Sequence, residues 1–132
     1  MGPLVADASA IVDYLSSGRE PTPYDEALTS GVELHVPEVC DVEVVSALRR
    51  SVLRGVMPPA DVPVLLIDYA ELPIHRHEHL SLLGRAFDLR ENFSASDAMY
   101  VALAERLDAS LLSADRRLVR AVRTHTSVST LP

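Results

Sequence analysis

A chain of 132 residues with 48% hydrophobic and 23% charged residues has the size and composition of one folded domain, and we expect residues 1–132 to form it. No apolar run approaches the roughly 20 residues that a membrane span needs, and no basic segment precedes a long apolar one as in a signal peptide, so we expect a cytoplasmic protein with no membrane partner. A formal net charge of −7 is unusual for a nucleic-acid binder, which usually has a basic surface. A divalent cation bound by several carboxylates would change the sign of the local charge.

Short apolar runs alternate with helical patterns along the chain. The apolar runs predict strands at 3–6, 33–36, 72–74 and 111–112, with a weak last strand near Val128. Apolar residues at helical spacing, with caps and glycine stops, predict helices at 9–17, 24–29, 39–54, 59–69, 78–90, 97–107 and behind Asp115. Alternating strands and helices imply parallel pairing with right-handed crossovers. We therefore predict an α/β fold, a three-layer α/β/α sandwich around a mainly parallel sheet of four or five strands.

Two of the predicted strands end in the same way. The first runs into Asp7 and Ser9, and the strand at 111–112 runs into Ser113 and Asp115. The carboxyl ends of parallel strands lie at one edge of a sheet, where such folds place their chemistry. If the two strands are neighbours, Asp7 and Asp115 approach each other, and two carboxylates there are either a repulsive liability or a cation site.

Two further acids are candidates to complete a site for a hard cation. Mg²⁺ and Mn²⁺ prefer oxygen ligands. Glu43 lies on a predicted helix that otherwise buries an apolar face, and Asp97 begins another apolar helix. The alternative is that Glu43 belongs to a solvated helix face and Asp97 is an N-terminal acid favoured by the helix dipole.

The four acids and their neighbours resemble a known family. The motifs are Asp7-Ala8-Ser9, Glu43 in Glu-Val-Val-Ser-Ala-Leu-Arg-Arg, Asp97 in Ser-Asp-Ala-Met-Tyr-Val-Ala-Leu-Ala, and Asp115 in Leu-Leu-Ser-Ala-Asp-Arg-Arg-Leu. In this order and spacing they resemble the PIN-domain ribonucleases, specifically the VapC-type toxins of bacterial toxin–antitoxin systems.

This resemblance implies a function and a set of site residues. It implies that Asp7, Glu43, Asp97 and Asp115 are catalytic and hold Mg²⁺ or Mn²⁺. Ser9 and Ser113 match supporting hydroxyl positions, although the family often has threonine at the second. It also implies an RNA substrate, a homodimer and a cognate VapB-type antitoxin. For the antitoxin we consider a contact surface formed by Tyr14, Leu15 and the helix from Pro59 to Tyr69.

The chemistry agrees with these residue types. A phosphodiester is anionic, so its hydrolysis needs a cation that neutralises the phosphate and lowers the pKa of an attacking water. A receiver-like phosphoaspartate protein would need a lysine, and this chain has none; a haloacid-dehalogenase-type phosphatase would resemble Asp-x-Asp, whereas Ser9 stands at the second position. The alternative from another class is a non-catalytic PIN-scaffold module that binds protein or RNA.

Other residues allow weaker predictions. Arg116, Arg120 and Arg123 are spaced to share one side of a helix, where they either bind RNA phosphates or are ordinary surface charges. His75, His77 and His79 would share a face on a strand, but without a fourth ligand we favour a solvated segment. Cys40 is the only cysteine, and we expect it to be a small core residue.

Overall fold

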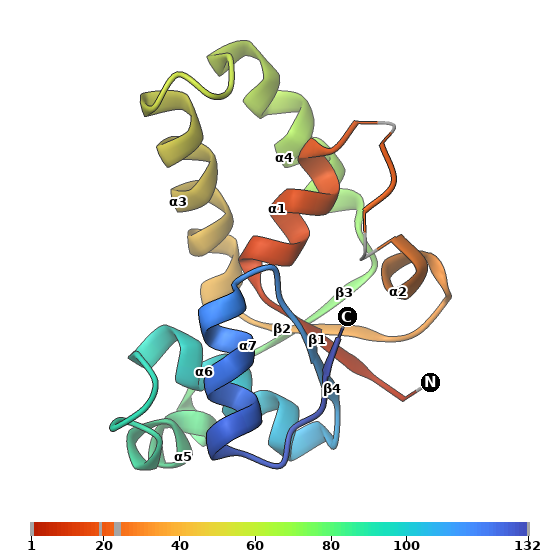
Figure 1. The fold of residues 1–132 in the computed structure, drawn as a ribbon. Helices are drawn as coiled ribbons and strands as arrows, with labels where there is room; N and C mark the ends of the chain where they lie inside the picture. Colours follow the sequence, from red (N-terminus) through yellow and green to blue (C-terminus); the bar gives the residue numbers. More distant parts are fainter. Residues whose placement is uncertain (1, 19, 23–24, 132) are drawn as a thin grey trace.

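The structure is a computed structural model that describes residues 2–18, 20–22 and 25–131. Within these residues, strands and helices alternate along the chain (Figure 1). The strands are β1 Leu4–Ala6, β2 Leu34–Pro37, β3 Ile74–His77, β4 Ser110–Leu112 and β5 Thr130–Leu131. The α-helices are α1 Ala8–Ser16, α2 Asp25–Thr29, α3 Val39–Leu53, α4 Val62–Glu71, α5 Leu83–Asp88, α6 Ala95–Leu107 and α7 Arg116–His125. Short 3-10 helices at Pro59–Asp61 and Leu80–Leu82 precede α4 and α5.

The five strands form one sheet in the order β3-β2-β1-β4-β5, and every pair is parallel. The first strand therefore lies at the centre of the sheet, with Ala6 paired to Leu112 of β4 and Leu4 paired to Leu34 of β2. β1 is buried along its whole length, as is usual for a strand covered on both faces. This order places the ends of β1 and β4 side by side, as the sequence analysis required for Asp7 and Asp115.

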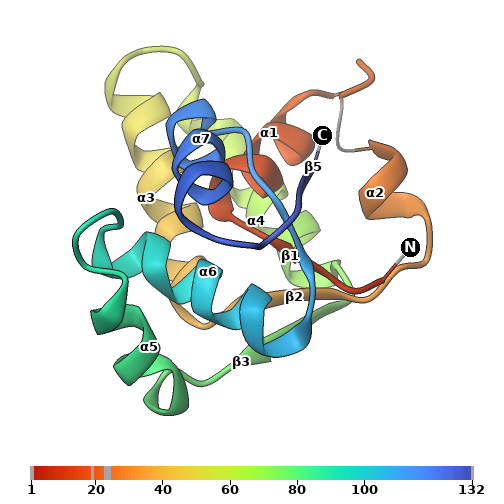
Figure 2. The same cartoon turned by 60° about the horizontal axis from the view of Figure 1, so that its bottom comes forward.

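Helices cover both faces of the sheet. α1, α3 and α4 lie on one side and α5 and α6 on the other, as Figures 1 and 2 show from two directions. α6 lies against β1, β2 and β4, and its residues from Tyr100 to Ala104 are buried. α7 packs beside β5 at one edge. The predicted three-layer α/β/α sandwich with a parallel sheet is confirmed.

Some predicted elements begin or end at other residues. The third strand starts at Ile74 rather than at residue 72, because Leu72 still caps α4 by donating its N–H to the Tyr69 carbonyl, and Pro73 has no N–H. The last strand is Thr130–Leu131; Val128 is not part of it, because its N–H bonds the Thr126 hydroxyl instead of a strand. The predicted helix start at residue 24 lies outside the described residues.

In two helices, some of the apolar residues at helical spacing are exposed rather than buried. α3 buries Cys40, Val44 and Leu48, while Val42 and Val45 are 65% and 53% exposed. In place of the helix predicted at 78–90, the structure has a 3-10 turn followed by the short helix α5. Phe87 of α5 is 65% exposed. In both cases apolar residues form more than one stripe, so helical spacing alone does not identify the buried one. No helix in the described part of the chain is both long and apolar enough to cross a membrane.

Candidate active site

Asp7 follows the last residue of β1 and is held by a dense set of hydrogen bonds. Its side chain is 6% exposed. Its Oδ1 accepts from the Ser9 hydroxyl at 2.6 Å and from the Ala10 N–H at 3.0 Å, and its Oδ2 accepts from the Ser113 hydroxyl at 2.5 Å. Asp7 is therefore the N-cap of α1, which begins at Ala8 rather than at residue 9 as predicted. Ser9 orients the carboxylate.

Ser9 and Ser113 tie the end of β1 to the end of β4. The two hydroxyl oxygens lie 3.4 Å apart. Ser9 accepts from the Ala114 N–H, and Ser113 accepts from the Asp115 N–H, each at 3.0 Å. The structure thus places both serines where the sequence analysis expected supporting hydroxyls. They fix the loop after β4 against Asp7.

Asp115 begins α7 in the same way that Asp7 begins α1. Its Oδ1 accepts from the N–H groups of Arg117 at 3.0 Å and Leu118 at 3.3 Å. Its Oδ2 lies 3.8 Å from the Arg117 guanidinium. An N-capping role alone would account for either aspartate singly. It does not account for two such aspartates at adjacent strand ends.

Glu43 projects from α3 toward the same place. It is half-buried, and its Oε1 accepts from the hydroxyl of Tyr100 at 2.6 Å. Tyr100 itself is 1% exposed and lies on α6, so this bond links the two helices that carry Glu43 and Asp97. The alternative of Glu43 on a fully solvated face does not hold.

Asp97 lies in the first turn of α6. Its N–H donates to the N-cap hydroxyl of Ser94 at 3.2 Å, and its Oδ2 lies 3.9 Å from the Arg117 guanidinium. Asp97 is therefore an acid at the N-terminus of a helix, where the helix dipole favours it, and it also lines the same cavity as the other three acids. Arg117 and Tyr100 were not among the residues predicted for the site. Arg117 lies two residues after Asp115, within the same motif, and Tyr100 lies one helical turn beyond Asp97.

All four acids line one cavity of about 610 Å³ between α1, α3 and α6. Burial is the main reason why the pKa values of Asp7, Glu43 and Asp97 are raised. The neighbouring carboxylates raise them further: Asp115 acts on Asp7 and Asp97, and Asp97 and Asp7 act on Glu43. Folding thus concentrates negative charge in one cavity at a cost in stability, which is typical of functional sites.

The donors in this cavity fit a hard divalent cation. They are carboxylates and serine hydroxyls, the oxygen ligands that Mg²⁺ and Mn²⁺ take. In residues 2–18, 20–22 and 25–131 no three His, Cys, Asp or Glu side chains are already drawn together as closely as metal ligands. The acids share one cavity, and carboxylates without a cation between them repel each other.

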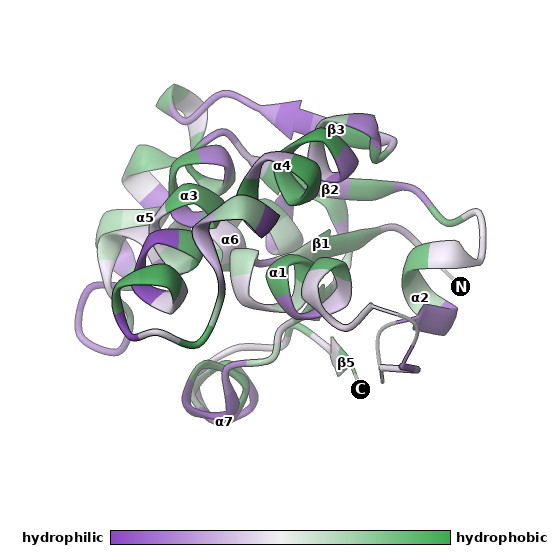
Figure 3. Cartoon of the chain, turned by 90° about the horizontal axis from the view of Figure 1, so that it is seen from above, coloured by the Kyte–Doolittle hydropathy of each residue, from purple (hydrophilic) through white to green (hydrophobic). Residues whose placement is uncertain are grey.

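The arginines of α7 extend from this cavity along the surface. Arg116, Arg120 and Arg123 are exposed, and Arg123 donates from its Nε to the Thr130 hydroxyl at 2.7 Å. Figure 3 shows hydrophilic colouring on the outer side of α7. The arginine row therefore begins beside Asp115 and faces away from the core.

The histidines on β2 and β3 have structural partners of their own. The His35 Nδ1 and the His77 Nε2 lie 2.8 Å apart, and the His35 ring stacks on His75 at 4.8 Å between centroids. His79 lies beyond the strand and accepts from the Val39 N–H at 3.0 Å, at the start of α3. The prediction of a solvated segment is therefore right for His75, which is exposed, and wrong for the half-buried His77 and His79.

Cys40, near the start of α3, is fully buried in the core. Burial raises the pKa of its thiol to about 11, so it stays protonated and cannot act as a nucleophile at neutral pH. The prediction of a small core residue is confirmed.

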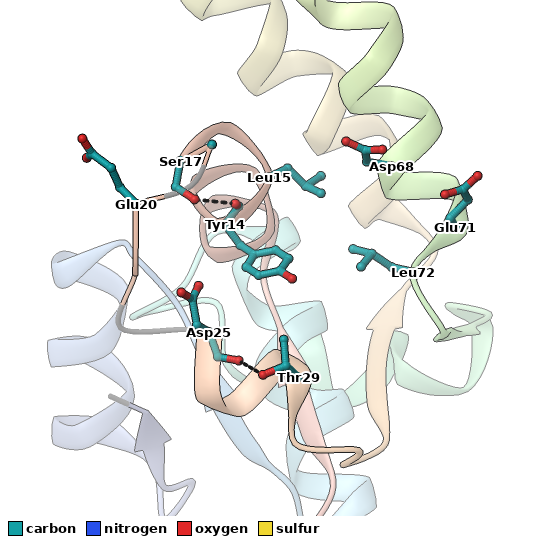
Figure 4. A pocket seen from close by; sticks show the side chains of 10 residues that line it. Tyr14, Leu15, Ser17, Glu20, Asp25, Thr29, Asp68, Glu71 and Leu72 are labelled. Carbon is teal, nitrogen blue, oxygen red and sulfur yellow. Dashed lines mark hydrogen bonds between the residues drawn. The ribbon is translucent and has the colours of Figure 1, made fainter.

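A second cavity, of about 620 Å³, lies between α1 and the end of α4 (Figure 4). Tyr14, Leu15 and Leu72 supply apolar lining, and carboxylates surround them. Those acids are Glu20, Asp25, Asp68 and Glu71. None of the four acids of the first cavity lines the second, so the two are separate features.

Comparison with known proteins identifies the family of this chain. The model of the PIN domain family matches residues 4–123. The chain belongs to the PIN-domain family. Its relatives include Ribonuclease VapC3 of Mycobacterium tuberculosis, 37% identical over 89% of this chain and 86% of that protein. Ribonuclease VapC9 of the same organism is 38% identical over 87% of each chain. The resemblance to VapC-type PIN proteins drawn from the sequence is confirmed.

Solved structures show the same fold in more distant chains. PAE2754 from Pyrobaculum aerophilum superposes with a TM-score of 0.73 at 20% identity, over 98% of this chain and 83% of that one. A chain from a toxin-antitoxin complex of Klebsiella pneumoniae gives a TM-score of 0.59 at 14% identity, over 85% of this chain and 86% of that one. At these identities the comparisons establish the PIN fold.

Proposed function

We propose that this PIN-domain protein is a Mg²⁺- or Mn²⁺-dependent endoribonuclease and the toxin of a type II toxin–antitoxin pair. The observation that carries the proposal is the convergence of Asp7, Glu43, Asp97 and Asp115 on one cavity at the carboxyl ends of β1 and β4. Relatives named ribonucleases, at 33–38% identity over most of the chain, support it.

The residues of the cavity would hold one or two divalent cations and orient the substrate. When bound, such a cation neutralises phosphate charge and lowers the pKa of an attacking water. Ser9 and Ser113 keep the Asp7 oxygens in place through hydrogen bonds of 2.6 and 2.5 Å. Arg117, which contacts Asp97 and Asp115, adds a positive charge at the mouth of the cavity, where an RNA phosphate would enter.

The partners of this function are an antitoxin of the VapB type and a second copy of the chain in a homodimer. For the antitoxin, the surface predicted around α1 and α4 has suitable apolar residues: Val64 and Ile67 are each 59% exposed. Tyr14 and Leu15 line the cavity between α1 and the end of α4 that Figure 4 shows. Tyr69, at the end of the predicted surface, is buried and belongs to the core.

Expression in bacteria tests the toxin assignment. We expect the wild-type chain to arrest growth, and the neighbouring small gene to restore it when it is co-expressed. Asp97→Asn should be harmless, because it removes one carboxylate charge from the cavity while Asn keeps the side-chain volume. Equal arrest by wild type and Asp97→Asn at matched protein levels would show that toxicity does not come from this cavity. No arrest together with antitoxin binding would favour a non-catalytic module.

The α7 arginines carry a separate prediction about RNA binding. Replacing Arg116 and Arg120 by alanine should weaken RNA binding at all sequences and lower the salt slope of log K by about one per lost phosphate contact. Filter binding of a non-cleavable RNA at several salt concentrations measures this. Arg90→Ala, which removes an exposed arginine that bonds the Phe87 carbonyl, is the control. An unchanged salt slope in the double variant would assign these arginines to the general surface.

A further inference from the structure

Tyr100 makes a contact that packing alone does not require. Its hydroxyl donates to Glu43 Oε1 at 2.6 Å across a sequence separation of 57 residues. Tyr100 also lies three residues after Asp97, one turn along α6, so it shares a face with that acid. One buried side chain therefore connects α3, which carries Glu43, with the helix that carries Asp97.

The hydroxyl is confined to the role of a donor. Tyr100 is 1% exposed, and a carboxylate oxygen can only accept, so the hydroxyl is the donor in this contact. A carboxylate has two oxygens, so a hydrogen bond at Oε1 still leaves one for a metal ion. Removing a hydrogen-bond partner of a metal-binding carboxylate typically lowers the metal affinity by about 10–100-fold.

We infer that Tyr100 is a positioning residue for the cation site, holding the Glu43 carboxylate toward the cavity by a hydrogen bond from α6. The inference rests on the proposed function, because Glu43 must be one of the ligands. It assigns to Tyr100 a role in metal affinity that is separate from its packing in the core. The Tyr100 hydroxyl does not touch the reacting atoms.

The chain contains a matched control for this contact. Tyr69 is also buried, at 7% exposure, and donates to Asp41 at 2.5 Å on the same helix α3. Its partner Asp41 also receives two hydrogen bonds from Arg76, at 3.0 and 3.1 Å, and does not line the cavity. Tyr100→Phe and Tyr69→Phe therefore remove the same atom from two similar contacts, of which only one reaches the proposed site.

Direct Mn²⁺ binding to the metal-stripped protein, measured without RNA by the electron paramagnetic resonance of free Mn²⁺, tests the inference. We expect the Kd for Mn²⁺ to rise about 10-fold in Tyr100→Phe and to stay unchanged in Tyr69→Phe. The Mn²⁺ concentration for half-maximal RNA cleavage should shift by the same factor, with the rate restored at saturating metal. A Tyr100→Phe protein with wild-type affinity, or an equal loss in Tyr69→Phe, would overturn the inference.

Two further measurements keep the result interpretable. Thermal unfolding of the metal-free variants establishes that both are folded. The wild-type protein is also labelled with 3-fluorotyrosine, and the ¹⁹F signals are assigned by replacing the other tyrosines in turn. Addition of Mg²⁺ should shift the signal of Tyr100 and leave the signal of Tyr69 unchanged. An unshifted Tyr100 signal would contradict the inference even if Tyr100→Phe does not fold. Absence of Mn²⁺ binding to the wild type would instead refute the proposed metal site itself.

Discussion

Asp7→Asn should reduce RNA cleavage by on the order of 100-fold or more, without unfolding the protein. Asn has nearly the same shape, can still cap α1 as Asp7 does, and can still bond the serine hydroxyls. What is lost is one negative charge in the cavity that would hold the cation. Cleavage of a labelled structured RNA under single-turnover conditions measures the effect.

The same substitution should stabilise the metal-free protein at neutral pH. Burial raises the pKa of Asp7, so the folded state holds this proton more tightly than the unfolded state. The contribution of Asp7 to stability is therefore full below its unfolded pKa, near about 4, and is lost as pH rises through the folded pKa. The free energy of unfolding of Asp7→Asn should therefore increase relative to that of wild type as pH rises through this interval.

Urea unfolding of both proteins between acidic and neutral pH, in the presence of a chelator, gives this comparison. Asp88→Asn, on the exposed side of α5 and outside the lining of the acidic cavity, is the control and should show no such gain. An Asp7→Asn protein that is inactive and also unstable at neutral pH would mean that Asp7 is required for the fold, not for the chemistry.

Removing divalent cations should abolish cleavage by the wild-type protein. Chelation followed by Mg²⁺ or Mn²⁺ should restore it, since the cavity offers oxygen ligands and no titrating histidine or thiol that could replace the metal. Added cation should also raise the Tm of wild type at neutral pH, because it binds only the folded state.

This gain in Tm should shrink as pH falls, because the raised pKa values of Asp7, Glu43 and Asp97 let protons compete with the metal. Differential scanning fluorimetry with and without Mn²⁺ at several pH values measures it. Cleavage that continues at full rate in excess chelator would contradict the mechanism.

The sequence predicts the sheet and the strand-end acids well, for a local reason. Fully apolar runs such as Leu4–Ala6 favour a buried strand, and their alternation with helices implies parallel pairing. Asp7 and Asp115 stand directly after two such runs, so their positions follow from the strands. The predicted site also needs β1 and β4 to be neighbours and α3 and α6 to bring Glu43 and Asp97 to the strand ends, as they do in the structure.

Features that depend on contacts between distant elements were not predictable in this way. Tyr100 has the pattern of an ordinary core residue in an apolar helix, and only the fold brings it to Glu43. The exposed Val42 and Val45 match helical spacing as well as the buried Val44 does. Which stripe of α3 is buried is decided by its contact with α1, which is formed in the tertiary structure.

The proposed function requires that the four carboxylates converge to hold a divalent cation. Anomalous diffraction from crystals grown with Mn²⁺ tests it most directly. We predict a peak in the cavity between α1, α3 and α6, with carboxylate oxygens of at least two of Asp7, Glu43, Asp97 and Asp115 at about 2.1 Å. A cavity without a peak at saturating Mn²⁺, or a peak only at the histidines of β2 and β3, would contradict it.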